Sequence, residues 1–342
     1  MDTTDFNAAA REGTLPLIPV EQLTVENLTK ANSSGNTPLH TAAKYGSLDQ
    51  LPPALLTAQT LLLKNAAGYT PLHHAARGGH LNQIPRELLT TDHLLLRSNS
   101  GYTSFHLCAA AGTLDQIPPA LLTAEIILNK TDVGNNLLHE AAEAGMLDRV
   151  PPHFLTAETL ATTNISGETV FHVAVFNGHL DQIPAEFLTA ANLLAKTSNH
   201  DTCLHAAAIA GHLDQVPPAL LTHENLVMPS KSGYTPIHAA AESGFLHQIP
   251  PDRLTVDLLI LRNEFGDTPM HAAAVEGHLN QIPAEYVNQA TLSIRNYSGG
   301  TPQGAAIRHG HADQLPPEFR PKQPTAWQSF LFKIGASRPR VG

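Results

Sequence analysis

A period of 33 residues runs through most of this 342-residue chain. The dipeptide Thr-Pro occurs at positions 37, 70, 235, 268 and 301, and every interval is a multiple of 33. Degenerate copies fill the gap between positions 70 and 235 without insertion or deletion. A fixed period of this length is typical of a solenoid, in which each unit buries its apolar surface against its neighbours. We therefore predict one elongated repeat array instead of the two domains that the length alone suggests.

Two columns of the repeat predict where helices begin. The column of Thr37 holds threonine in eight of nine units and asparagine in the other, and the column of Thr57 has the same composition. A short side chain with an acceptor oxygen is what a helix N-cap requires. Each unit is therefore predicted to begin two helices. Apolar residues at i, i+3 and i+4, such as Leu72, Ala75 and Ala76, support the first of them.

Glycine and proline predict where these helices end. The column of Gly79 is expected to stop the first helix, and the column of Gly68 to form a turn with positive φ. His200 departs from the second column, which leaves the geometry of that turn open. Every unit has a proline in the column of Pro85. Proline cannot sit inside a helix, so the second helical stretch should split into a short turn and a second short helix.

The pattern G-x-TPLH-x-AA-x-x-G-H-L, best seen in GYTPLHHAARGGHL at residues 68–81, resembles the ankyrin repeat. The resemblance extends to about residue 319. It implies an all-α, ankyrin-like solenoid of nine 33-residue units and a divergent N-terminal capping unit. The corresponding segments are a cap at 1–33, repeats at 34–319, and a basic amphipathic C-terminal segment at 320–342. The proline that interrupts the second helix is a departure, similar to a variant found in bacterial ankyrin proteins.

Eight histidines occupy one column of the repeat: His40, His73, His106, His139, His172, His205, His238 and His271. Packed helices place such residues about 8–10 Å apart, whereas the ligands of a metal converge within about 2 Å of one ion. The row is therefore predicted to be structural, and the resemblance implies that each histidine bonds the capping threonine. We predict no metal and no cofactor.

Other features exclude several classes of function. No constellation of acid, base and nucleophile appears, so the chain is predicted not to be an enzyme. The net charge is −10, although residues 320–342 are basic, and an acidic body disfavours nucleic acid. Two cysteines, no long apolar run and no secretory signal predict a cytoplasmic protein without a membrane span, with export as an effector left open.

The residues that vary between units are expected to face a partner. The resemblance assigns this role to the two residues before the turn glycine, the one after it, and the two before the helix-ending glycine, here called the recognition face. Five of the six tyrosines lie there. Aromatic and arginine side chains suit binding, and packing of the rings along their own turns is the alternative. The candidate binding residues are Tyr45, Tyr69, Arg77, Tyr102, Phe176, Tyr234, Phe265 and Tyr297.

Acidic residues share this face: Asp132, Glu143, Glu168, Asp201, Glu242, Glu264, Asp267 and Glu276. We therefore expect a protein partner with a basic and partly apolar surface. The predicted function is a non-enzymatic protein–protein interaction scaffold that binds through its concave, turn-bearing face.

The alternative function is a targeting or effector adaptor that docks through its basic C-terminal segment. There Trp327, Phe330, Leu331 and Ile334 follow helical spacing. This segment either caps the last unit or docks elsewhere.

Overall fold

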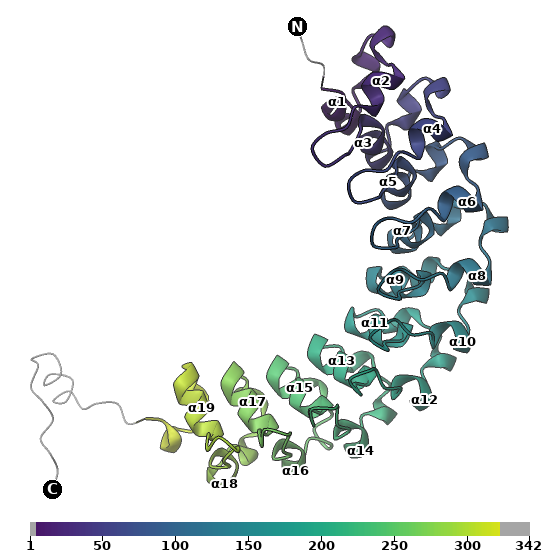
Figure 1. Ribbon diagram of the computed structural model, residues 1–342. Helices are drawn as coiled ribbons and strands as arrows, with labels where there is room; N and C mark the ends of the chain where they lie inside the picture. Colours follow the sequence, from purple (N-terminus) through teal and green to yellow (C-terminus); the bar gives the residue numbers. More distant parts are fainter. Residues whose placement is uncertain (1–4, 322–342) are drawn as a thin grey trace, which may run out of the picture. The chain divides into compact units, whose positions relative to one another are not determined.

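The computed structural model describes residues 5–321, and apart from an isolated β-bridge between Thr163 and Thr169 their regular secondary structure is helical. The all-α prediction is confirmed. The chain forms two compact units, whose described parts are residues 5–220 and 221–321 (Figure 1). The amphipathic segment predicted around Trp327 lies outside the described residues.

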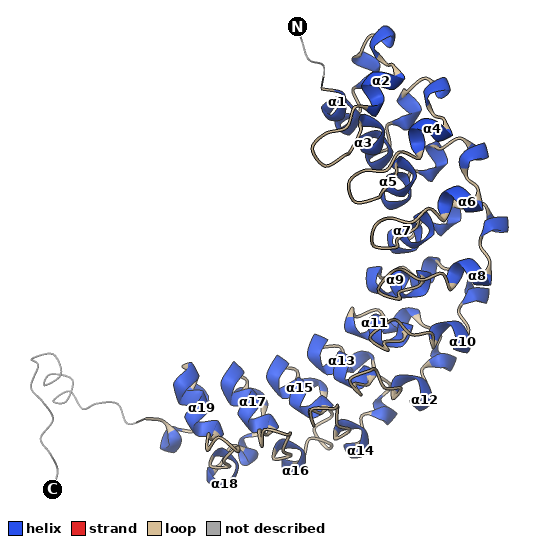
Figure 2. Cartoon of the chain, viewed as in Figure 1, coloured by secondary structure: helices blue, strands red, loops and turns tan. Residues whose placement is uncertain are grey.

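One repeat consists of a turn, a first helix, two short 3-10 helices on either side of a proline, and a very short second helix. Figure 2 shows this alternation of helix and loop along each unit. The first helices of residues 5–220 are α1 (Phe6–Glu12), α3 (Pro38–Tyr45), α5 (Pro71–Gly78), α7 (Ser104–Ala111), α9 (Leu137–Ala144), α11 (Val170–Phe176) and α13 (Cys203–Ala210). Those of residues 221–321 are α15 (Pro236–Ser243), α17 (Pro269–Glu276) and α19 (Pro302–His309).

The second helices have only four or five residues. In residues 5–220 they are α2 (Val25–Thr29), α4 (Ala58–Leu61), α6 (Thr91–Leu94), α8 (Ala124–Ile127), α10 (Ala157–Leu160) and α12 (Ala190–Leu193). In residues 221–321 they are α14 (His223–Leu226), α16 (Val256–Leu259) and α18 (Gln289–Leu292).

The proline column interrupts the second helical stretch as predicted. It leaves two 3-10 helices instead of one turn, except in the repeat of Pro250, where residues 251–253 form a turn. Those before the proline are Leu15–Leu17, Leu48–Gln50, Leu81–Gln83, Leu114–Gln116, Leu147–Arg149, Leu180–Gln182, Leu213–Gln215, Leu246–Gln248, Leu279–Gln281 and Ala312–Gln314. Those after it are Val20–Gln22, Pro53–Leu55, Arg86–Leu88, Pro119–Leu121, Pro152–Phe154, Ala185–Phe187, Pro218–Leu220, Ala284–Tyr286 and Pro317–Phe319. The additional 3-10 helix begins at the proline itself, since the Pro85 carbonyl accepts the Leu88 N–H at 2.9 Å.

Both predicted N-cap columns are confirmed. At the start of α5, Thr70 Oγ1 accepts the His73 N–H, and His73 Nδ1 accepts the Thr70 N–H at 3.1 Å. This reciprocal capping box satisfies two N–H groups that the first helical turn leaves unpaired. At the start of α6, Thr90 Oγ1 accepts the His93 N–H at 3.3 Å.

The glycine columns adopt the conformations that the sequence predicts. Gly79 ends α5 with φ of 73° and Gly68 forms its turn with φ of 80°. His200, which replaces the turn glycine in one repeat, has φ of 65° and retains the turn, because its N–H donates to the Thr197 carbonyl at 2.9 Å. The turn left open by the sequence is therefore formed, although a side chain in this region costs about 1–2 kcal/mol.

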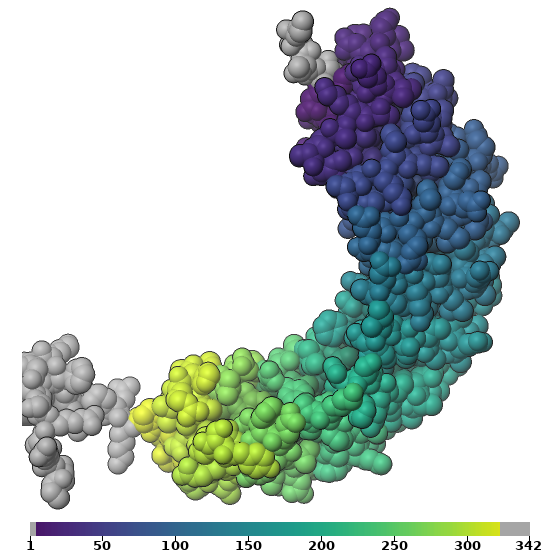
Figure 3. Space-filling view, viewed as in Figure 1, coloured from purple at the N-terminus to yellow at the C-terminus, as the bar shows by residue number. Residues whose placement is uncertain are grey.

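The core is built from small residues of the first helix and leucines of the segments that follow. Ala75, Ala76, Leu81 and Leu94 are fully buried in one repeat. The first helices approach closely: a Cβ at position 78 would lie 2.3 Å from the Lys44 carbonyl oxygen. This packing joins the repeats of residues 5–220 into one continuous surface (Figure 3).

A glutamine bridge links consecutive repeats, and the sequence analysis did not anticipate it. Gln116 Nε2 donates to the Gly79 carbonyl at 2.7 Å, while its Oε1 accepts the Leu81 N–H at 2.9 Å. Gln83, Gln182 and Gln215 make the same pair of bonds in their repeats. The carbonyl and the N–H lie beside the C-terminus of a first helix, where the helix itself offers no partner. One amide therefore ties two repeats together.

The bridge generates a prediction about stability. Gln182→Ala should lower the free energy of unfolding by about 2 kcal/mol, because the Leu147 N–H and the Gly145 carbonyl lose their partner. Arg149 occupies the glutamine position of its own repeat, so Arg149→Gln should add the missing bridge and raise the free energy by about 1 kcal/mol. Urea denaturation followed by circular dichroism measures both changes. Equal midpoints for the two variants and the wild type would refute a stabilising bridge.

Candidate functional site

The histidine row is part of the framework, as predicted. His73 Nδ1 accepts the N–H of Thr70 and lies 2.8 Å from Thr70 Oγ1, and Nε2 lies 2.8 Å from the Leu96 carbonyl oxygen. Because Nδ1 accepts a backbone N–H, the proton of the neutral ring is on Nε2, which donates to the carbonyl. Within residues 5–321, no cluster of His, Cys, Asp and Glu is arranged to hold a metal ion.

Burial keeps these rings neutral. Removal from solvent lowers the pKa of His73, His106 and His139 to about 4, because burial penalises the charged imidazolium. A second proton would also have to sit on Nδ1, where it would face the N–H of the capping residue. The row therefore contributes structure in its neutral form and no ligand chemistry.

Three of the predicted binding residues, Tyr69, Tyr102 and Tyr234, are half-buried. Each ring packs on the histidine of its own repeat, with ring centroids 5.4–6.0 Å apart. Aromatic contacts at this distance stabilise the folded chain. These tyrosines therefore fill the packing role that the sequence analysis kept as the alternative.

The hydroxyl groups of two of these tyrosines meet carboxylates. The Tyr234 hydroxyl donates to Glu242, and burial together with that carboxylate raises the pKa of Tyr234. Burial, and then the negative charge of Glu140, raises the pKa of Tyr102 to about 12. Both phenols therefore remain protonated donors at neutral pH. Glu140 is itself buried, and burial raises its pKa.

The other predicted residues point toward solvent. The exposed fraction is 46% for Tyr45, 51% for Phe176, 62% for Phe265 and 73% for Tyr297, and Arg77 is also exposed. Tyr45 and Phe176 lie in the last turns of α3 and α11, while Phe265 and Tyr297 lie on turns. The structure thus divides the eight residues into three that pack on the framework and five that a partner can reach.

The turns that form one edge of the recognition face are tied to one another. Asn65 Oδ1 accepts the N–H groups of Ala67 and Tyr69, and Asn65 Nδ2 donates to Asn36 Oδ1 of the preceding turn at 2.7 Å. The Ala66 N–H donates to the Ser34 carbonyl at 3.2 Å. These bonds hold the turns in place before a ligand arrives. The sequence analysis missed this feature, although the Asn, Ser and Thr residues in the column of Asn65 were a usable signal.

A recess of about 430 Å³ opens on the recognition face of residues 5–220. Its polar lining includes the carboxylates of Glu143, Glu168 and Asp201, and its apolar lining includes Phe176 and Ile209. No lysine or arginine of the described part of the chain lines it. We call these five residues and the hollow between them the acidic recess.

Ile209 was not singled out by the sequence analysis. It occupies the same repeat position in α13 as Phe176 does in α11, and 47% of it is exposed. The shared position was the signal that could have identified it. The candidate residues were aromatic side chains and one arginine, so an aliphatic residue was not among them.

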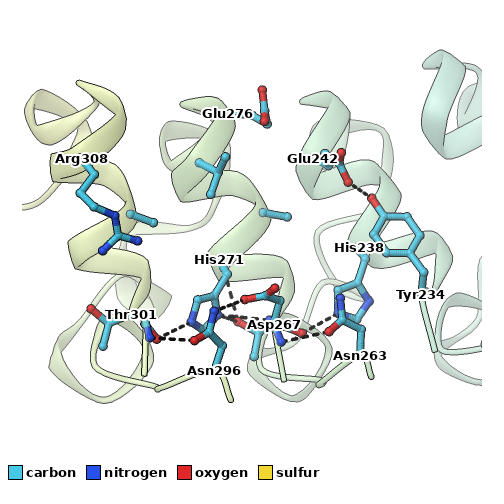
Figure 4. A pocket seen from close by; sticks show the side chains of 15 residues that line it. Tyr234, His238, Glu242, Asn263, Asp267, His271, Glu276, Asn296, Thr301 and Arg308 are labelled. Carbon is cyan, nitrogen blue, oxygen red and sulfur yellow. Dashed lines mark hydrogen bonds between the residues drawn. The ribbon is translucent and has the colours of Figure 1, made fainter. Parts of the chain in front are cut away.

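A second recess, of about 290 Å³, lies on the recognition face of residues 221–321 (Figure 4). Figure 4 shows Glu242 and Glu276 on α15 and α17, and Arg308 on α19. The Asp267 carboxylate accepts Asn296 Nδ2 at 2.7 Å, and Glu242 accepts the Tyr234 hydroxyl. Because Arg308 lines this recess together with its three carboxylates, the recess is less strongly acidic than the first.

Comparison with known families settles what kind of repeat this is. The family model of the ankyrin repeat matches residues 34–66 and 67–96. The chain is an ankyrin-repeat protein. Ankyrin repeats are generally protein–protein interaction modules. A comparison with curated proteins gave no match.

The described part of this ankyrin-repeat protein contains no helix that is long and apolar enough to cross a membrane. Its first helices have at most eight residues, and all of them end at or near a glycine or polar cap. The surface features that remain for recognition are the exposed side chains and recesses of the recognition face.

The neutral histidine row makes the stability of this ankyrin-repeat protein depend on pH. For His73, His106 and His139 the pKa is about 4 in the folded protein, against an ordinary histidine value of 6.5. The unfolded chain therefore binds protons first, and the free energy of unfolding should fall as pH decreases from about 6.5 toward 4. At pH 5 the loss is roughly 2 kcal/mol for each of the three residues.

Melting temperatures at pH 7.5 and pH 5 measure this loss. The His106→Gln variant serves as the control: it should be less stable at pH 7.5 but lose less than the wild type between the two pH values. A wild-type melting temperature that does not change would show that the histidines are not the source of pH dependence.

Proposed function

We propose that this ankyrin-repeat protein is a non-enzymatic scaffold that binds a protein partner on its recognition face. The observation that carries the proposal is the acidic recess, where exposed Phe176 and Ile209 lie beside three carboxylates. The helices already fix the backbone that carries these exposed apolar side chains, so binding a partner has only their side-chain torsions to order. An aromatic residue in such a position is a frequent energetic centre of an interface.

The chemistry of the recess indicates the partner. Glu143, Glu168 and Asp201 favour a positively charged ligand, and no lysine or arginine of residues 5–321 lines the recess to supply that charge. A partner segment that carries lysine or arginine next to an apolar residue would satisfy both parts of the lining. The same carboxylates repel a phosphate backbone, which disfavours nucleic acid. We further propose a cytoplasmic location, because Cys108 and Cys203 are both free and buried.

The division of the chain into a cap at 1–33, repeats at 34–319 and a basic segment from residue 320 is part of the proposal. Arg320 Nε donates to the Leu315 carbonyl at 2.7 Å, and Gln303 Nε2 donates to the Phe319 carbonyl at 2.8 Å. These bonds hold the end of the last repeat, so the basic segment starts beside α19. We favour a capping role for it over the alternative of an adaptor that docks through this segment.

The first test compares capture of a partner from lysate by the wild type and by Phe176→Ala/Ile209→Ala. Both side chains are about half exposed, so the variant should fold. The matched control is Leu17→Ala/Val20→Ala, which removes two exposed apolar side chains outside the recognition face. With the purified partner, we expect the first variant to weaken binding at least tenfold, which corresponds to about 1.4 kcal/mol, and the control to bind like the wild type.

Two results would count against the proposal. Equal binding by the wild type and Phe176→Ala/Ile209→Ala would place the contact elsewhere on the chain. Binding that does not weaken between 50 and 500 mM salt would remove the electrostatic part of the argument, since screening should reduce contacts between exposed charges. Tyr69, Tyr102 and Tyr234 are poor choices for this test, because their loss would also disturb the histidine framework.

A further inference from the structure

A smaller recess of about 190 Å³ lies at the N-terminal end of the recognition face, and its charge is opposite to that of the acidic recess. It is lined by residues of α1, α3 and the turn between α2 and α3, including Asn7, Arg11, Asn32, Asn36 and Lys44. Among residues 5–321, no aspartate or glutamate lines it. We call these five residues and the hollow between them the basic recess.

The asparagines of the basic recess present donors, because their oxygens are already used. Asn32 Oδ1 accepts the N–H groups of Ser34 and Asn36, both at 3.0 Å. A backbone N–H can only donate, so the amide of Asn32 is oriented with its NH2 group left over.

The other two amides are arranged in the same way. Asn36 Oδ1 accepts from Asn65 Nδ2 at 2.7 Å, and Asn7 Oδ1 accepts from Thr41 Oγ1 at 3.0 Å. The NH2 groups of Asn7 and Asn36 therefore remain as donors. Three amide donors in a recess without a carboxylate favour an anionic ligand.

Within the part of the chain that the structure describes, no carboxylate forms an ion pair with the two cations of the recess. Arg11 and Lys44 are exposed residues in the last turns of α1 and α3. Among residues 5–321 the ion pairs are Arg97–Asp132 and Arg149–Asp148, so neither cation has an acidic partner. Lys44 Nζ instead lies 5.1 Å from the centre of the Tyr45 ring.

The positive charge continues into the next repeat. Arg11, Lys44 and Arg77 occupy the same repeat position in α1, α3 and α5, and Arg77 is also exposed. Burial lowers the pKa of His74 to about 4, and the nearby charges of Lys44 and Arg77 act in the same direction. The positive charges of Lys44 and Arg77 therefore contribute to keeping the His74 ring neutral.

We propose that the basic recess binds side-chain carboxylates of an acidic segment in a protein partner. The inference rests on the proposed function, in which this face receives a protein. Arg11 and Lys44 supply the charge, the three asparagines supply neutral donors, and Tyr45 offers an apolar surface for the methylene groups of glutamate. Arg77 extends the contact toward α5.

The position of the basic recess also determines the orientation in which the partner binds. Further along the same unit, the recess of Glu143, Glu168 and Asp201 requires the opposite charge. A partner that is acidic where it meets α1 and α3, and basic where it meets α9 to α13, fits in one orientation. The reversed orientation would place like charges together, which opposes binding.

The test measures binding of a fluorescein-labelled octaglutamate peptide to the full-length protein by fluorescence anisotropy at 50 mM salt. Octaglutamine of the same length is the neutral control peptide. The variant is Arg11→Gln/Lys44→Gln, and its matched control is Arg86→Gln/Lys196→Gln, which removes two exposed cations outside the recognition face. We expect the wild type and the control variant to bind octaglutamate, the recess variant to bind it at least tenfold more weakly, and none to bind octaglutamine.

Each other outcome would overturn the proposal. No binding by the wild type, or equal weakening in both variants, would mean that the recess is not a specific carboxylate site. Displacement of octaglutamate by equimolar single-stranded DNA or inorganic phosphate would show that the recess takes phosphate groups in preference to a protein segment. These results leave the capture experiment with Phe176→Ala/Ile209→Ala unaffected, so failure here is distinguishable from failure of the proposed function.

Discussion

In most repeats the bonds of one histidine connect the start of a helix with the end of the same repeat or the next turn; Gly304 replaces it in the repeat of α19, and Nε2 of His172 lacks such a bond. In the repeat of α5, Nδ1 of His73 completes the cap with Thr70, and Nε2–H reaches the carbonyls of Leu96 and Tyr102. Local helix initiation and packing between repeats therefore depend on the same neutral ring. Its burial is tolerated because both nitrogens have partners, and an unpaired ring in this position would destabilise the fold. The rest of the repeat is arranged around this contact.

Because the framework is confined to a few columns, the last turns of the first helices are free to vary. The column that holds Arg11, Lys44 and Arg77 at one end holds Phe176 and Ile209 further along the first unit. A solenoid thus converts a short repeated unit into an ordered series of different side chains on one face. The bonded turns keep that series rigid, so the binding specificity that we propose depends on which residues occupy the column.

Much of the local structure could be predicted from the sequence. Threonine and asparagine at two fixed positions predicted where both helices of a repeat begin. The glycine column predicted where the first helix ends, with a residue in the left-handed conformation. Both preferences act within a few residues of the chain, which is why the sequence reveals them. The proline column predicted the interruption, but the second 3-10 helix was missed. The glutamine bridge of Gln116 was also missed, since its partners Gly79 and Leu81 lie in the preceding repeat. For the site, the column positions were predicted, but the burial of Tyr102 and the exposure of Ile209 were not.

The sequence by itself determined that this chain is an all-α ankyrin-repeat protein, where its helices begin and end, and that its histidines belong to the framework. These features follow from short-range sequence preferences. Because the same pattern recurs in nine 33-residue units, a chance match is negligible. Only the tertiary structure decided which variable residues are accessible, which tyrosines are engaged by histidines, and which charges remain unpaired. The reason is physical: exposure and charge pairing depend on neighbours in the adjacent repeats. Lys44 and Tyr102 both occupy variable positions of the recognition face, but Lys44 is exposed and Tyr102 is half-buried.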